Sequence, residues 1–133
     1  MIRHIPFNFV HKGVSDILKE KQTTNVYDQM REESVLPCVT FGSFTWKRDG
    51  AKAIDISNTS TELHIWSSDM GKKEVEEICN DVAAVLTAWE LEADGTGFKC
   101  LEQDIDMVEV YEAENAGFHG VITFIAKIQY VGG

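Results

Sequence analysis

Hydrophobic positions near the start of the chain recur at helical spacing. Apolar side chains follow one another at steps of three and four residues, which places them on one face of a helix: Phe7, Val10, Val14, Ile17 and Leu18. Pro6 suits the first turn of such a helix, where the missing N–H group would have no partner. The pattern predicts a helix over residues 6–20, which the TTN at 23–25 ends.

The next segments are typical of strands. Val26 and Tyr27 can begin a short strand, and the charged segment that follows to Ser34 has no regular period. Residues 36–47 are rich in β-branched and aromatic side chains, so they predict a longer strand. Pro37 favours a strand entry or an edge position, because proline donates no hydrogen bond to a neighbouring strand.

A polar turn and two further strands are predicted before the middle of the chain. The turn is KRDGAK at 47–52, and the strands cover about 53–57 and about 59–67. In the second of these, alternate residues share a face. Thr61, Leu63 and Ile65 fall on one face, and the opposite face carries Glu62, His64 and Trp66.

A second helix has the clearest pattern in the chain. Seven side chains fall on one arc at 100° per residue: Val75, Ile78, Cys79, Val82, Val85, Leu86 and Trp89. Ser68 or Asp69 is expected to cap its first turn by accepting backbone N–H bonds. The ADGTG at 93–97 predicts a turn after the helix.

Two long strands close the chain, over about 98–111 and 118–131, with ENAG as the turn between them. In the last strand apolar residues occur at both parities, so both of its faces are expected to be covered. The order helix, strands, helix, strands predicts an α+β fold: a mostly antiparallel sheet with two helices packed on it. At 133 residues the chain is expected to form one domain, residues 1–133.

Charge is distributed unevenly along the sequence. The formal net charge is -10; residues 74–114 hold 13 acids and one base, which makes -12, and the remaining 9 acids and 11 bases make +2. Binding of nucleic acid through phosphate neutralisation is disfavoured, since it needs clustered lysine and arginine. An acidic half favours solubility, a basic protein partner, or a surface that does not adhere to DNA.

The N-terminus and the cysteines indicate the cellular compartment in which the protein is expected. The N-terminal MIRHIPFNFV lacks the continuous apolar core of a signal peptide, and no apolar run is long enough to cross a bilayer. Cys38, Cys79 and Cys100 each lie in an apolar pattern without CxxC spacing, so they are interpreted as small core residues. A cytoplasmic protein without membrane contact is expected.

Motifs for catalysis or metal binding are not recognisable. The four histidines, at 4, 11, 64 and 119, form no HxH or HxxxH pair. Ser67 and Ser68 lack the GxSxG context of a nucleophile elbow, and the DGTG at 94–97 has the wrong order for an aspartic protease. The sequence therefore predicts no catalytic residues, no metal site and no cofactor.

Acidic residues occupy every second position in part of one predicted strand, at Glu102, Asp104 and Asp106. On a strand these carboxylates share a face at about 7 Å intervals. Three interpretations of these carboxylates are open. They can form a solvated outer face, or they can contact a basic partner surface or line an acidic channel. The third interpretation is a divalent-ion or acid–base site. The apolar parity shifts after Met107, to Val108 and Val110, which suggests a bulge or a region covered on both sides.

Two further groups of residues are candidate contacts with other chains. Ala84 and Ala88 lie opposite the apolar arc of the second helix. Alanine is present there either because it is a good helix former or because its small side chain leaves room for another subunit. The turn tip carries Trp46, Lys47, Arg48 and Asp49. Tryptophan and arginine are enriched at interface hot spots, although Trp46 can also fold back into the core.

Several segments together resemble the tail-completion or tail-terminator family of long-tailed phages, prophages and gene transfer agents. They are the proline-led strand LPCVTFG, the strand LHIWS, the helix EVEEICNDVAAVL and the final GVITFIAKIQY. Their order matches that family from about Met1 to Tyr130.

The resemblance implies a structural virion protein without catalytic residues. Members form a ring of copies of themselves, usually a hexamer, at the head-proximal end of the tail tube. The ring ends tube polymerisation and meets the head connector or stopper, and DNA passes through it without specific binding. A chain with an acidic half and a balanced half offers the two different patches that a ring needs. The acidic strand is the candidate for lumen or subunit contact.

Two alternatives remain open at this point. A neck or head–tail joining protein has a similar fold. A small-ligand-binding or enzymatic α+β domain belongs to another class, and it requires a concave pocket with convergent polar groups. Assembly of a tail component would place the protein in the host cytoplasm first and in the virion tail afterwards.

Overall fold

The computed structural model describes residues 1–50, 53–68, 71–114 and 117–132. Within these ranges two helices and five strands alternate in the predicted order of helix, strands, helix, strands. The elements are α1 Phe7–Lys21, β1 Asn25–Tyr27, β2 Cys38–Arg48, β3 Ile56–Trp66, α2 Lys73–Ala88, β4 Phe98–Ala113 and β5 Gly117–Tyr130. The α+β fold class is confirmed.

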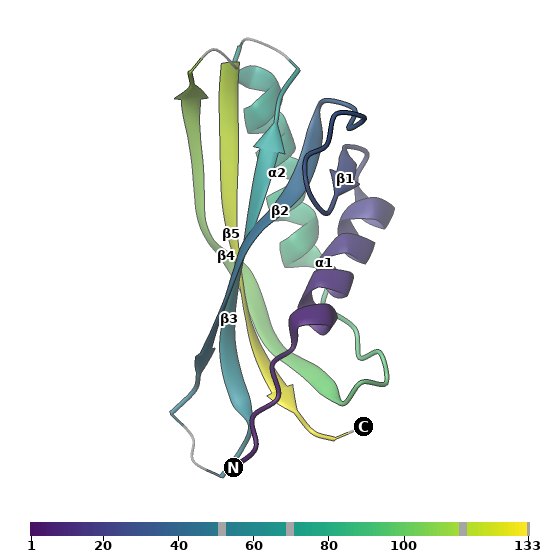
Figure 1. Ribbon diagram of the computed structural model, residues 1–133, viewed down its shortest axis with the longest axis vertical. Coiled ribbons are helices and arrows are strands. Elements are labelled where there is room, and N and C mark those ends of the chain that lie inside the picture. The colour runs from purple at the N-terminus through teal and green to yellow at the C-terminus, as the bar shows by residue number, and fades with distance from the viewer. Residues whose placement is uncertain (51–52, 69–70, 115–116, 133) are drawn as a thin grey trace.

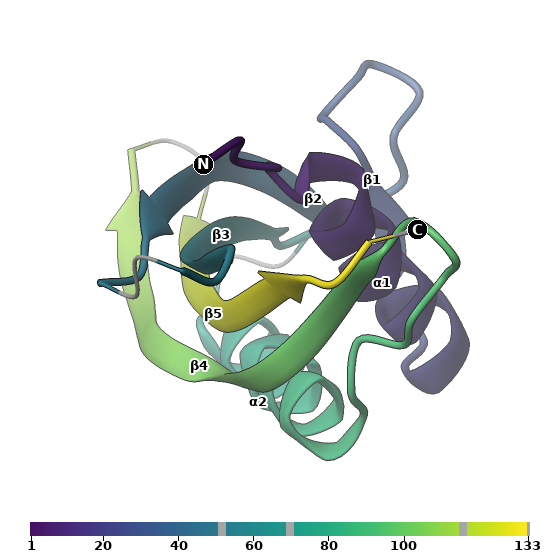
Figure 2. The same cartoon turned by 90° about the horizontal axis from the view of Figure 1, so that it is seen from below.

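The five strands form a strongly twisted sheet in the order β1-β2-β3-β5-β4. The short β1 pairs with β2 in parallel, and the other three junctions are antiparallel. In Figure 1, β2 runs from upper right to lower left, whereas β4 runs from lower right to upper left. Both helices lie on one side of the sheet (Figure 2). We call the face that they cover the inner face, and the opposite one the outer face.

The core lies between the inner face and the two helices. Alternation along β3 and β5 decides which side chains enter it, because successive residues of a strand point to opposite faces. The largest fully buried side chains come from both helices and from three strands: Val10, Val14, Leu18, Val39, Leu63, Ile65, Val75, Val82, Leu86, Ile122, Phe124 and Ile128. The outer residues of β5, such as Val121 and Ile125, are half-buried.

A glycine permits the close approach of α2 to the sheet. A Cβ atom on Gly120 of β5 would lie 2.7 Å from Sγ of Cys79 and 3.1 Å from Cγ1 of Val75. Both of these residues belong to α2, and both are buried. Any larger residue at this position would therefore push the helix away from the sheet.

Most predicted elements are confirmed, with small shifts at their ends. The first helix, predicted over 6–20, is observed one residue later, and the short strand at 26–27 is present as β1. β2 begins two residues later than predicted, so Pro37 precedes it as an entry residue. The predicted strands over 98–111 and 118–131 are β4 and β5.

The prediction of separate strands over 53–57 and 59–67 is wrong. One continuous strand, β3, covers Ile56–Trp66. Asn58 suggests an interruption when it is read locally, but it pairs with Lys47 of β2 on one side and with Lys127 of β5 on the other. Backbone pairing on both sides outweighs the low strand propensity of asparagine.

Two predictions about the ends of α2 are also corrected. Ser68 does not cap the helix, because its N–H and hydroxyl groups donate to the carboxylate of Glu74; Asp69 lies outside the described residues. The N-cap position is taken by Lys72 without a side-chain hydrogen bond. Trp89 follows the helix and is 48% exposed, so it does not belong to the buried arc.

The C-terminal end of α2 is held by a side chain from β4. The amide nitrogen of Gln103 donates to the carbonyl oxygens of Leu86, at 2.9 Å, and of Trp89, at 2.7 Å. Its amide oxygen accepts the N–H of Leu91 at 2.8 Å. Gln103 thus satisfies groups that the end of a helix leaves without a partner.

No helix in the described ranges combines the length and the apolar character needed to cross a bilayer.

Candidate functional site

The end of β2 presents the predicted contact residues at the lower left of Figure 1. Lys47 and Arg48 are exposed, and the salt bridges among the described residues include neither. Trp46 is half-buried against the inner face, and its indole N–H is buried without a hydrogen-bond partner within the described part of the chain. The Trp46 side chain thus lies partly in the protein interior and partly at the surface. A contact role for this end of β2 stays a prediction.

Ala84 and Ala88 are exposed on α2, as their positions opposite the apolar arc require. The Thr87 hydroxyl next to them donates to the carbonyl oxygen of Ala83 at 2.8 Å, so it satisfies its donor within the helix. This leaves a small-residue surface that another chain could approach closely. Its use as an interface stays a prediction.

Glu102, Asp104 and Asp106 of β4 are all exposed, but they do not form one regular row. Glu102 and Asp104 face outward opposite Lys127 and Ile125 of β5. Asp106 lies in a bulge, because the register with β5 shifts between Ile105 and Met107. The bulge predicted from the change of apolar parity is therefore confirmed. A second irregularity lies between Cys100 and Glu102.

Lys127 connects the two predicted contact regions across the outer face. Its ammonium nitrogen lies 3.6 Å from a carboxylate oxygen of Glu102 in β4 and 3.6 Å from one of Asp49 at the end of β2. Glu102, Asp104 and Lys127 also line a groove of about 370 Å³ on this face. The fold thus brings together residues that the sequence separates by more than fifty positions.

A cluster of polar and aromatic side chains on the outer face was not predicted. Nε2 of His64 lies 2.7 Å from Oε1 of Glu62, and Nδ1 of His64 lies 2.7 Å from Nε2 of His119. An ionised Glu62 accepts the Nε2–H of His64, so His119 donates to the remaining nitrogen of His64. The ring of His119 contacts those of Trp66 and Tyr111, with ring centroids 4.3 and 5.3 Å apart.

The environment of His119 favours its neutral form. Only 4% of the residue is exposed, and Nδ1 has no hydrogen-bond partner within the described ranges. Burial lowers the pKa of His119 below its ordinary value, and a charge on His64 would lower it further, while Glu62 acts in the opposite direction. His119 is almost fully buried, and it is among the residues that line a groove of about 360 Å³.

Sequence reasoning could have found half of this cluster. Glu62 and His64 alternate along one strand, so their shared face follows from the strand period. His119 is 55 residues away from His64, and only the pairing of β3 with β5 brings the two rings together.

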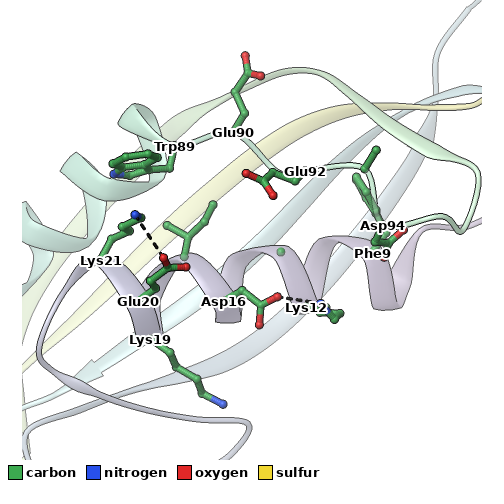
Figure 3. A pocket seen from close by; sticks show the side chains of 13 residues that line it. Phe9, Lys12, Asp16, Lys19, Glu20, Lys21, Trp89, Glu90, Glu92 and Asp94 are labelled. Atoms are coloured by element: carbon green, nitrogen blue, oxygen red, sulfur yellow. Dashed lines mark hydrogen bonds and ion pairs between the residues drawn. The ribbon is translucent and has the colours of Figure 1, made fainter.

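A larger groove separates α1 from the segment that follows α2 (Figure 3). Its volume is about 930 Å³, and its rim carries charged side chains of both signs. Lys12 pairs with Asp16 at 2.9 Å, and Lys21 lies 3.9 Å from the ring centroid of Trp89. Lys19 lines the groove as well, together with five acidic side chains, so charges of both signs are mixed along it.

The described residues hold no group of three or more histidine, cysteine or acidic side chains arranged to bind a metal ion. All three cysteines are free. Burial raises the pKa of Cys79 and of Cys100 to about 11, so neither thiol is a thiolate at neutral pH.

Comparison with known proteins shows the family of the chain. The sequence model of the tail completion protein gp17 family matches residues 12–129, which is most of the chain. The chain belongs to this family. The resemblance inferred from the order of LPCVTFG, LHIWS and the second helix is thereby confirmed. Membership in the tail completion protein gp17 family supports a role in virion tail assembly.

Two solved structures share the fold of this tail completion family member. A chain in the virion of a native gene transfer agent (GTA) particle is 14% identical with a TM-score of 0.75, over 87% of this chain and 91% of that one. The gp17 protein of bacteriophage SPP1 is 17% identical with a TM-score of 0.57, over 95% of this chain and 93% of that one. No curated protein matches the sequence.

Proposed function

We propose that this protein is a tail terminator: copies of it form a ring, six in number, at the head-proximal end of a tail tube. The ring ends polymerisation of the tube protein and joins the tail to the head connector or stopper protein. Membership in the tail completion protein gp17 family is the observation that carries this proposal. The protein acts as a structural component without catalytic residues or a cofactor, made in the host cytoplasm and retained in the virion tail.

The charges of the molecule support a DNA conduit. The net charge of -10 and the exposed carboxylates of Glu102, Asp104 and Asp106 repel phosphate. DNA that passes through such a ring would slide without specific binding. These carboxylates are therefore proposed to line the lumen or to contact the neighbouring subunit.

Exposed groups elsewhere provide surfaces for the protein partners. The end of β2, with Trp46, Lys47, Arg48 and Asp49, and the alanine surface of α2, with Ala84 and Ala88, are proposed to contact a neighbouring subunit or the tube. The exposed cations at the end of β2 lie on an otherwise acidic protein, so they favour an acidic counterpart.

The proposal is tested by assembling particles without this protein. We expect tails of uncontrolled length and heads without tails, seen by electron microscopy, and normal particles when the wild-type protein is supplied. A Trp46→Ala, Arg48→Ala variant should fail to restore them while its far-UV circular dichroism is unchanged. The matched control is Lys72→Ala, Lys73→Ala, which removes exposed cations beside α2. Normal tails joined to heads in the absence of the protein would contradict the proposal.

A further inference from the structure

The sheet has two free edges. β4 pairs with β5 only, and β2 pairs with β1 only through residues 38–40. Residues 41–48 of β2 therefore lie beyond the last parallel pair and have no second neighbour among the described strands. The unpaired N–H and C=O groups of such edges can receive another strand.

These edges lie on opposite sides of the molecule. In the lower half of Figure 1, β2 ends at the left and β4 begins at the right, with β3 and β5 between them. A surface on one side of each copy can thus meet a different surface on the next copy, which is the arrangement that closes a ring.

The two edges carry opposite charges. Lys47 and Arg48 are exposed at the end of β2, and Glu102, Asp104 and Asp106 are exposed in β4. Two β4 edges would repel each other, as would two β2 edges, whereas β4 attracts β2. The bulges and charges of β4 also keep an edge strand from pairing indiscriminately, so they restrict its partner to a basic edge.

Strand direction and side-chain direction both allow the junction. β2, β3, β5 and β4 alternate in direction, so β4 runs opposite to β2. Copies that share one orientation in a ring would therefore pair β4 with β2 in the antiparallel sense. Lys47 lies on the outer face opposite Asn58, and Glu102 lies on the same face opposite Lys127, because Asn58 and Lys127 are themselves paired. Lysine and carboxylate would thus meet on one face.

We propose that β4 of one copy, over about residues 101–108, adds to residues 41–48 of β2 in the next copy. The junction continues the antiparallel sheet from subunit to subunit and places Lys47 beside Glu102 and Asp104. This inference rests on the proposed ring and specifies how its subunits join. It also commits the acidic residues of β4 to subunit contact.

Charge reversal in two complementary variants tests the junction. One variant, Lys47→Glu, Arg48→Glu, has two acidic edges; the other, Asp104→Lys, Asp106→Lys, has two basic edges and keeps the pair between Glu102 and Lys127. Assembly is measured by sedimentation velocity and native mass spectrometry, with far-UV circular dichroism as the check on folding. Each variant alone should require about tenfold or more protein to assemble than the wild type does.

An equimolar mixture of the two variants should assemble again, because acidic and basic edges can alternate around a ring with an even number of subunits. The matched control is Lys72→Glu, Lys73→Glu, which makes the same charge change beside α2 and should assemble like the wild type. Hydrogen exchange should slow in residues 41–48 and in about residues 101–108 when the wild type assembles, as their edge amides become bonded.

The outcomes separate the two proposals. If the wild type assembles and the mixture assembles no better than either variant alone, the edge junction is wrong and the ring stands. If the control is weakened as much as the β2 variant, the effect is one of net charge, and the junction is also wrong. If the wild type forms no assembly at high concentration or with tail tubes, the ring and the junction both fail.

Discussion

Individual side chains on the outer face depend on one another closely. Gly42 of β2 leaves space for a polar pair, because a Cβ atom there would lie 2.7 Å from Nε2 of His64 and 2.9 Å from Oε1 of Glu62. That pair orients His64 toward the buried His119. The missing side chain in one strand therefore helps to define the hydrogen bonds of the next two strands.

Buried His119 predicts a pH dependence of stability. Its pKa is lowered in the folded protein by burial and by His64, so the unfolded chain binds the proton more readily. Above pH 6.5, the ordinary pKa of histidine, the neutral ring makes its full contribution to the free energy of unfolding. As the pH falls from 6.5 through the lowered pKa of the folded protein, the free energy of unfolding decreases. The loss is at most about 1.4 kcal/mol per pH unit for one group.

The measurement is urea unfolding of the wild type and His119→Gln between pH 5 and pH 7. The variant should lose part of the decline in free energy of unfolding toward pH 5, although it is less stable at pH 7. His11→Gln, which replaces a more exposed histidine of α1, controls for the loss of one imidazole. Parallel pH profiles for the wild type and His119→Gln would contradict the assignment of His119 as a buried neutral ring.

Among the elements, α2 depends on both of its neighbours in the sheet. β5 provides the glycine that permits close packing, and β4 provides Gln103, which bonds the backbone at the end of the helix. Gln103 shares its face with Ile105, and a polar residue in such a position looks like an exception to the apolar pattern. Its hydrogen bonds to Leu86, Trp89 and Leu91 explain the exception.

Replacing Gln103 by methionine should lower the free energy of unfolding by about 2 kcal/mol. The substitution keeps the size of the side chain but leaves two carbonyl groups and one N–H group without partners. Urea unfolding gives the energy, and the amide of Leu91 should exchange hydrogen faster in the variant. Gln29→Met, at an exposed position before β2, should change stability by less than about 0.5 kcal/mol. Equal effects of the two variants would refute the capping role.

For the molecule as a whole, helices and strands share one contiguous core. Buried side chains from α1, α2, β2, β3 and β5 contact each other in it, so no element can bury its apolar surface alone. That residues 1–133 form one domain, which unfolds cooperatively, stays a prediction.

The three tryptophans can test that prediction, because they report on separate regions. Trp46 is near the end of β2, Trp66 is the last residue of β3, and Trp89 follows α2. Three variants, each with two tryptophans changed to phenylalanine, should show the same urea midpoint by fluorescence as by far-UV circular dichroism. A midpoint that differs between the two methods in any variant would reveal a region that unfolds separately.

Periodicity predicted much of the fold because burial acts on every turn of a helix and every second residue of a strand. The inward positions of α2 from Val75 to Leu86 follow directly from the 3.6-residue period, and Leu63 and Ile65 follow from alternation. Trp89 fits the same arc but lies after the end of the helix. Periodicity predicts which face of a helix is buried, but it does not predict the residue at which the helix ends. Asn58 illustrates the reverse case, in which pairing overrides local preference.

The candidate site was predictable only in part. The exposure of Lys47, Arg48 and the β4 carboxylates follows from their charge, as the cost of burying an unpaired ion requires. The ion pair of Lys127 with Asp49 and the contact of His64 with His119 could not be predicted, because they join strands that are far apart in the sequence. The ion pair of Lys127 with Glu102 lies within the predicted pair of final strands, but its register could not be predicted from the sequence.

The amino-acid sequence alone determined the fold class, the faces of the helices and strands, the unequal charge of the two halves and the family resemblance. These properties follow from local period, composition and motif order. The tertiary structure decided the strand order β1-β2-β3-β5-β4, and with it the two free edges and the contact of His64 with the buried His119. Strand order depends on which long-range pairings bury the most apolar surface together, and that is a property of the whole chain.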